Sequence, residues 1–382
     1  MTLDLPPKSG MRIEAIDLAR VVATVLMIEG HTLDALLHPS YQSAGWYNLW
    51  LFVRGFTAPT FMMMSGFSFA LATLRHWDRY SHLSAAVLRR ALRFASFILL
   101  GYAMRFPVRS LRDLRWLDAA GWQAGLQVDV LQAIGATLLL LQLLVLVSRT
   151  PARFARFCLG LAAAIALAAP ALWLHWKAGE LPTFLLAYIG GSTGSPFPLF
   201  PWAAYLLLGA AAGRFYFSYG TRGGTKPTFA FARVLLFGGA LAAMTGMLLE
   251  KQAIPLYGEA IFWRASPTLV LMRAGVVSFL MGVLLQLRQL PQAAGATIRI
   301  WAEESLLVYF VHVCLLYGSL WNTGLRQNFS GLNAPQALLA AAAMIASMLL
   351  LALLWNRFKR GLPLPALAFR AAMCMVAVWS LM

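Results

Sequence analysis

Long apolar runs separated by short polar segments make up most of the chain. A run of about 20 apolar residues is long enough to cross the hydrocarbon core of a bilayer as one helix. The pattern predicts an all-α, polytopic integral membrane protein with about 10–11 transmembrane helices in a single bundle. The expected spans lie near residues 13–37, 46–73, 87–106, 127–148, 154–176, 197–217, 231–249, 268–287, 304–321 and 336–356, with an eleventh at 362–382.

Three polar segments lie outside these spans or lead into one. Residues 1–10 form a polar N-terminal tail, and residues 108–125 are too charged to cross, so a short helix at the outer interface is expected there. Residues 189–202 are rich in Gly, Pro and Ser, which is typical of a surface loop. No repeat or second domain is evident, so residues 1–382 are expected to form one membrane domain.

The first apolar run carries more polar residues than a helix that faces lipid should. Residues at alternating spacings of 3 and 4 form a stripe about 100° wide, which comprises Asp17, Arg20, Thr24, Met27, His31 and Asp34. With a rise of ~1.5 Å per residue, the stripe extends about 21 Å from Asp17 to His31. Ionisable residues in a membrane helix turn inward or toward water, and are candidate functional groups.

His31 and Asp34 lie one helical turn apart on this stripe. The imidazole suits a general base, and the carboxylate would orient the ring and favour its protonated form. The alternative is a histidine that simply hydrogen-bonds between helices. Asp17 and Arg20 either form an internal ion pair at the cytoplasmic end, or Arg20 binds a phosphate.

Three ionisable residues near this helix have simpler interpretations. Glu29 faces away from the stripe and is expected to contact a neighbouring helix. His38 lies in the following loop, where it is either exposed or a second candidate base. Arg54 lies within the second expected span, where it needs water or an acid, and an acid on the first helix is the simplest partner.

Later runs add further candidates for binding substrate or cofactor. Ser305, Tyr309 and His312 share one helix face at spacings of 4 and 3, so His312 is either functional or packed between helices. Asp129 and Gln132 begin another span, where they serve either a site or a helix cap.

A tryptophan and an arginine are adjacent in FWRASP, at residues 262–267. Trp263 and Arg264 would lie at an outer helix start, where an aromatic platform beside a base suits a sugar or an anion. Anchoring at the membrane interface is the alternative.

Composition narrows the function class. Of 382 residues, 60% are hydrophobic and 12% are charged, which is too apolar for a soluble protein of this size. The net charge of +17 does not indicate nucleic acid, because the basic residues lie between apolar runs and not on one face. The majority of the 31 Lys and Arg residues fall in loops that are cytoplasmic if the N-terminus is, so we expect that orientation. No metal is expected, because the His and Cys residues do not cluster as ligands.

Six motifs follow one another along the chain: RIEAIDLARVVATVLMIEGH, FTAPTFMMMSGFSFAL, VDVLQAIG, PFPLFPWAAYLLLGAAAGR, EAIFWRASPTLVLMRAG and ESLLVYFVHVCLLYG. In order and spacing they resemble the heparan-α-glucosaminide N-acetyltransferase catalytic-domain family, within the broader transmembrane acyltransferases. The likeness covers nearly the whole chain, although each motif alone is mostly apolar.

The resemblance implies an enzyme that takes acetyl from cytoplasmic acetyl-CoA and delivers it across the membrane to an amine or hydroxyl, such as that of a sugar. It also implies a bacterial-type member in the inner membrane, in which His31 and Asp34 match the histidine and following acid of bacterial relatives. Other matching positions are Asp17 and Arg20 in an opening D-x-x-R, Trp202 in a P-W pair and His312 in a late Y-x-x-H.

The chain departs from the family pattern near the candidate base. Bacterial relatives often have an acid directly before the histidine, where this chain has Gly30, with Glu29 one residue earlier. In the animal lysosomal branch the histidine falls in the next loop, which favours His38. The base is therefore His31 or His38.

Other function classes remain open at this point. The polar stripe would also serve as the pathway of a transporter or flippase for a lipid-linked or small anionic solute, although no inverted repeat is evident. A structural membrane protein is a third alternative. Whether the chain acts as a monomer or a homodimer is open as well.

Overall fold

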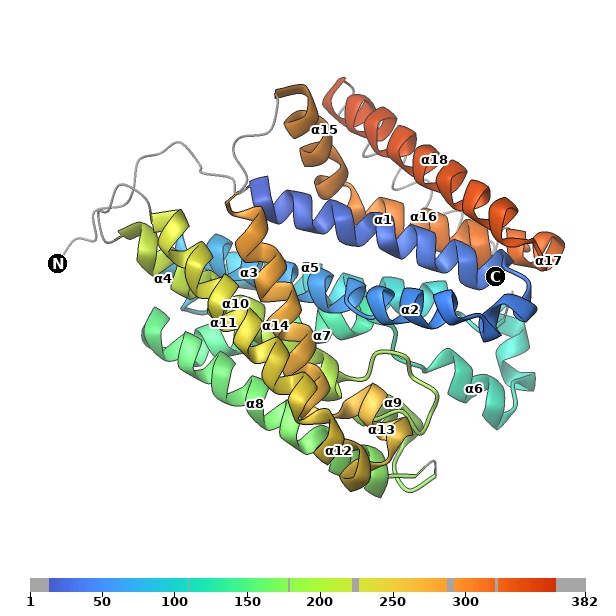
Figure 1. Ribbon diagram of the computed structural model, residues 1–382, viewed down its shortest axis with the longest axis horizontal. Helices are drawn as coiled ribbons and strands as arrows, with labels where there is room; N and C mark the ends of the chain where they lie inside the picture. Colours follow the sequence, from blue (N-terminus) through green and yellow to red (C-terminus); the bar gives the residue numbers. More distant parts are fainter. Residues whose placement is uncertain are drawn as a thin grey trace. The chain divides into compact units, whose positions relative to one another are not determined.

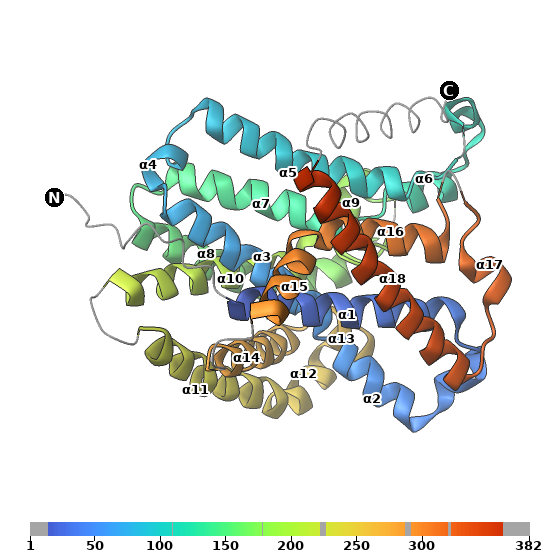
Figure 2. The ribbon, with the colours of Figure 1, turned by 90° about the horizontal axis from the view of Figure 1, so that it is seen from above.

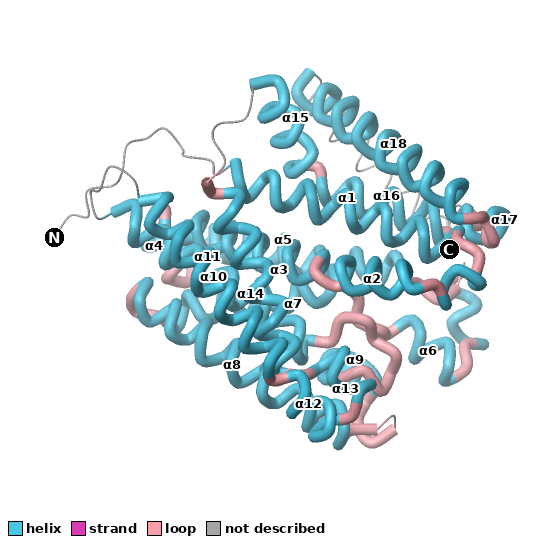
Figure 3. The backbone as a smooth tube through the Cα atoms, viewed as in Figure 1, coloured by secondary structure: helices cyan, strands magenta, loops and turns pink. Residues whose placement is uncertain are grey.

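The structure is a computed structural model that describes residues 14–108, 110–177, 179–221, 227–286, 292–319 and 322–361. These residues form helices joined by loops, and no strand is present among them (Figure 3). The predicted all-α class is confirmed. The expected tail at 1–10 and the expected eleventh span at 362–382 lie outside the described residues.

Within the described residues, 5 helices are long and apolar enough to cross a membrane. They are α7 (Val130–Val147), α8 (Pro151–His175), α11 (Pro227–Leu248), α14 (Pro267–Leu284) and α18 (Ala334–Gly361). A sixth is counted if α15 (Gln292–Glu303) and α16 (Ser305–Tyr317), which are bent by 64° at their junction, form one broken span. The chain is therefore a polytopic membrane protein.

Three further expected spans are helical but fall outside this set: α1 (Glu14–Leu36), α5 (Ala85–Met104) and α10 (Leu199–Thr221). The expected span 46–73 is wrong as a single helix, since α2 (Gly45–Arg54) ends before α3 (Thr57–Leu74) begins. Gly55 caps α2, and Pro59 in the first turn of α3 has no N–H to continue a helix. The expected span 304–321 is shortened because α16 ends at Gly318, where φ is 95°.

Short helices occupy the expected non-spanning segments. The segment 108–125 contains η2 (Leu111–Trp116) and α6 (Ala119–Gly125), while its place at the interface stays a prediction. A loop is confirmed between α9 (Thr183–Ile189) and the start of α10, although Thr193 and Ser195 are buried within it.

The chain divides into two compact units. The first comprises Met1–Ile16, Pro59–Arg105 and Gln123–Arg288, and the second comprises Asp17–Ala58, Phe106–Trp122 and Gln289–Met382. Whether they act as one domain stays a prediction.

Helix pairs build the first unit. α5 packs beside α7, α8 beside α10, and α11 beside α14 (Figure 2). The approach of α11 and α14 requires glycine, because a Cβ on Gly275 would lie 2.4 Å from the backbone nitrogen of Ala243. The unit also contains α4 (Trp77–Tyr80), α12 (Glu250–Tyr257) and α13 (Glu259–Ala265).

An apolar core joins four helices of the second unit, α1, α15, α16 and α18 (Figure 1). Ile28 of α1 and Val308 of α16 are fully buried in it, next to Trp301 of α15 and Ala352 of α18. The unit also contains η1 (Pro39–Ser43), α2 and α17 (Leu325–Phe329). This core fixes α1 against α16, and so sets where the polar residues of α1 meet their partners.

Candidate functional site

Two polar contacts join α1 to α16 in the second unit. His31 Nδ1 lies 2.9 Å from His312 Nε2, and Arg20 donates a hydrogen bond of 3.0 Å to the Ser305 hydroxyl. The predicted face of α16 is thereby confirmed, because Ser305 and His312 both turn to α1. His312 is fully buried, whereas His31 is half-buried.

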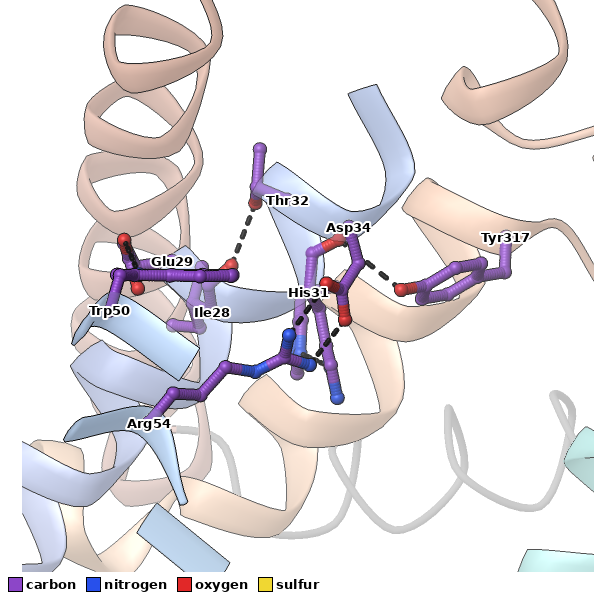
Figure 4. A network of polar contacts seen from close by, with 9 residues as sticks. Ile28, Glu29, His31, Thr32, Asp34, Trp50, Arg54 and Tyr317 are labelled. Atoms are coloured by element: carbon purple, nitrogen blue, oxygen red, sulfur yellow. Dashed lines mark hydrogen bonds and ion pairs between the residues drawn. The ribbon is translucent and has the colours of Figure 1, made fainter. Parts of the chain in front are cut away.

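Two tyrosines of α16 support the histidine pair. The Tyr317 hydroxyl donates to the backbone carbonyl of His31 at 3.2 Å, as Figure 4 shows. The Tyr309 ring meets the His312 ring edge-on, with centroids 5.8 Å apart. The first contact holds the backbone of α1 at His31, and the second packs against the His312 ring.

Two acids of α1 contact α2. Both carboxylate oxygens of Asp34 accept hydrogen bonds from the Arg54 guanidinium, and Glu29 accepts one of 2.7 Å from the Trp50 indole N–H (Figure 4). The expectations that Arg54 pairs with an acid of the first helix and that Glu29 contacts a neighbouring helix are confirmed. The His31 ring also contacts His312, and Asp34 also contacts Arg54, while the expected orientation of His31 by Asp34 stays a prediction.

His38 has a local structural role. It precedes η1, and its Nδ1 accepts the backbone N–H of Ser40 at 3.2 Å. A backbone N–H can only donate, so Nδ1 carries no proton, and in the neutral ring the proton is on Nε2. His38 Nδ1 thus serves as a cap of η1, and a role of His38 as the base stays a prediction.

The buried end of the stripe lies toward the start of α1. Asp17 is 7% exposed and Thr24 is 1% exposed, and the Thr24 hydroxyl donates a hydrogen bond to the Arg20 carbonyl. Asp34, at the other end, is exposed. Asp34 is thus the more exposed of the two aspartates of the stripe.

The first unit holds the remaining candidates. Asp129 caps α7 and forms a capping box with Gln132, which confirms the helix-cap interpretation. Asp129 also pairs with Arg105 at 3.0 Å. Gln132 is fully buried.

The tryptophan candidates lie on separate helices of that unit. Trp202 of α10 packs on Phe197, with ring centroids 4.6 Å apart, and the Arg273 guanidinium lies 6.0 Å from its ring centre. Trp263 and Arg264 are exposed in the last turn of α13. Their expected place at a helix start is corrected, because Ser266 caps the next helix and ends α13.

A family model for the catalytic region of heparan-alpha-glucosaminide N-acetyltransferase matches residues 12–245. The chain belongs to this family. No curated protein matches it. The matched residues include α1 and α2, and they end before α16, which carries His312.

Membership in this family makes the chain a transmembrane enzyme of the N-acetyltransferase type. The sequence had not indicated three polar residues that join helices of the second unit, namely Trp50, Tyr317 and Glu304. Glu304 is 5% exposed at the bend between α15 and α16, where Asn356 and Lys359 of α18 contact one of its oxygens. Its position at the start of an apolar run was the only signal that it would be buried.

Proposed function

We propose that the chain transfers an acetyl group from cytoplasmic acetyl-CoA to an amine or hydroxyl, of a sugar or glycoconjugate, on the extracytoplasmic side of a bacterial inner membrane. His31 is the proposed general base. The observation that carries the proposal is the His31–His312 pair in a chain of this acetyltransferase family.

Two observations favour His31 over His38 as the base. The His38 ring is held as a helix cap with its basic nitrogen engaged by the Ser40 backbone. The half-buried His31 ring contacts a second imidazole, which positions it. A base needs a fixed ring whose unprotonated nitrogen can reach the nucleophile.

Direct transfer is the proposed reaction. The acceptor nitrogen or oxygen bonds to the acetyl carbonyl carbon while its proton passes to His31. The carbon–sulfur bond breaks, its electron pair stays on sulfur, and the CoA thiolate then takes the proton from His31. Holding donor and acceptor together supplies much of the rate, because it makes the reaction effectively unimolecular.

Basic residues at the cytoplasmic end are proposed to hold the phosphates of CoA, with Arg20 as the candidate on α1. The slender pantetheine arm would carry the thioester toward His31. The remaining candidate substrate contacts are Asp17, Arg54, Asp129, Gln132, Trp202, Trp263, Arg264 and Tyr309.

The test uses purified protein in vesicles, with acetyl-labelled acetyl-CoA and glucosamine on opposite sides. Wild type should transfer label, and His31→Ala should abolish transfer while acetyl-CoA binding persists. His38→Ala is the matched control and should retain transfer. Normal turnover in His31→Ala with loss in His38→Ala would move the base to the loop, and no transfer by wild type to any amine or hydroxyl would overturn the proposal.

A further inference from the structure

The proton positions on the histidine pair follow from a backbone contact. His312 Nδ1 lies 2.7 Å from the carbonyl oxygen of Val308, one turn earlier on α16. A carbonyl oxygen accepts and never donates, so His312 Nδ1 must carry a proton. In a neutral ring, His312 Nε2 then carries the lone pair.

Burial keeps His312 neutral. Its side chain is fully buried between α1 and α16, and a charged imidazole there would lose its hydration. The contact at 2.9 Å between His312 Nε2 and His31 Nδ1 must therefore be donated by His31. His31 carries its proton on Nδ1, and its Nε2 is the basic nitrogen.

The ring geometry agrees with this hydrogen bond. The two ring centroids are 5.2 Å apart and the planes differ by 16°. That separation is close to the nitrogen–nitrogen distance plus the two ring radii, so the rings meet edge to edge in nearly one plane. The His31 N–H thus points along the lone pair of His312, which is the favourable direction for a donor.

We infer that His312 is a positioning residue, which fixes His31 in the Nδ1–H tautomer and so presents Nε2 as the base toward the acceptor. The role of Nε2 as a base rests on the proposed function, whereas the tautomer assignment rests on the contacts alone. A buried aspartate holds the catalytic histidine in this way in serine proteases, where loss of the right tautomer costs about 10⁴-fold in rate. Here the neutral imidazole of His312 takes that part, through its contact with His31.

The residues that the family model matches end at 245, so the match does not include His312. The chain therefore supplies the partner of its candidate base from α16. Val308 acts through its backbone, so no side-chain signal in the sequence marks it.

The experiment compares His312→Leu with His312→Gln. Leucine has no acceptor, so kcat should fall about 100-fold or more while KM for acetyl-CoA stays within about twofold. Glutamine can place its carbonyl oxygen where Nε2 lies and should restore most of kcat. Leu315→Ala, on the exposed side of α16, is the control and should leave both constants unchanged.

A direct readout is the ¹⁵N spectrum of ring-labelled histidine, with the His31 signals assigned by their loss in His31→Ala. Wild type should show a protonated Nδ1 and an unprotonated Nε2 on His31, and His312→Leu should shift the proton toward Nε2. A protonated Nε2 on His31 in wild type, or equal losses of kcat in the leucine and glutamine variants, would overturn the inference. The spectrum needs no substrate, so it tests the tautomer assignment separately from the proposed function. Absence of acetyl transfer would reject the proposed function alone.

Discussion

The Arg54 guanidinium on α2 contacts both carboxylate oxygens of Asp34 on α1, with Nη1 2.5 Å from Oδ1. Two parallel contacts make the strong form of an arginine–carboxylate pair. The side chains of Arg54 and Asp34 remain 25% and 31% exposed, so water screens the pair only in part. The pair joins α2 to the helix that carries the candidate base.

Removing one partner should destabilise the protein. Arg54→Gln should lower the free energy of unfolding by about 1–3 kcal/mol, because Asp34 keeps its charge and loses its strongest donor. Thermal unfolding in detergent, followed by tryptophan fluorescence, measures the change.

The matched variants are Asp34→Asn and the double variant Arg54→Gln/Asp34→Asn. Their double-mutant cycle should give a coupling energy of about 0.5–3 kcal/mol. Additive losses in the double variant would show that the contact contributes nothing to stability.

A buried carboxylate makes a second prediction. Glu304 lies at the bend between α15 and α16, and Lys359 supplies its counter-charge. Lys359→Met should cost about 3–5 kcal/mol, because it leaves a buried charge with only the Asn356 amide. The double variant Lys359→Met/Glu304→Gln should recover much of the loss, measured by the same unfolding assay.

Arg360→Met provides the control for this pair. Arg360 contacts Glu303 at 3.8 Å, and its side chain is 62% exposed, so its removal should cost no more than about 1 kcal/mol. Equal losses for Lys359→Met and Arg360→Met would mean that burial of Glu304 does not strengthen its pairing.

Helices could be predicted from sequence where an apolar run continues without a break. The runs 127–148 and 268–287 lie within three residues of α7 and α14 at both ends. The break at Gly55 is hard to see in hydropathy, because the residues around it are mostly apolar apart from Arg54. A backbone cap, and not a polar residue, ends that helix.

The residue types of the site were predictable, but most of their pairs were not. Spacing along one helix favours His31 with Asp34, yet packing gives His31 a partner 281 residues away. Lys359 lies beside two arginines and so resembles ordinary cytoplasmic charge, although it contacts Glu304 55 residues earlier. Contacts between distant segments depend on how the apolar core sets the helices, which periodicity alone does not contain.

Membrane orientation is the third prediction. Because the majority of basic residues fall in loops on the side of the N-terminus, a reporter fused after Arg79 should be cytoplasmic. One fused near Gly191, between α9 and α10, should be extracytoplasmic. Paired alkaline phosphatase and fluorescent-protein fusions measure both positions, and the reverse pattern would place the proposed acetyl-CoA site on the wrong side.

Close packing of α3 and α10 in the first unit makes the last prediction. A Cβ on Gly66 would lie 1.9 Å from the Leu206 carbonyl oxygen, and one on Gly209 would lie 2.0 Å from that of Met63. Gly66→Ala should therefore force the helices apart and cost about 1–3 kcal/mol or more in thermal unfolding.

Gly160 of α8 is the matched control, because a Cβ there meets nothing within 4 Å. Gly160→Ala should be neutral or stabilise by up to about 1 kcal/mol, since alanine loses less backbone entropy in a helix. Both substitutions add one methyl group to a helix. A difference in stability between the variants therefore reports the contact with the neighbouring helix, which only Gly66 makes. Equal unfolding temperatures for both variants would mean that α3 and α10 do not cross at Gly66 and Gly209 in the folded protein.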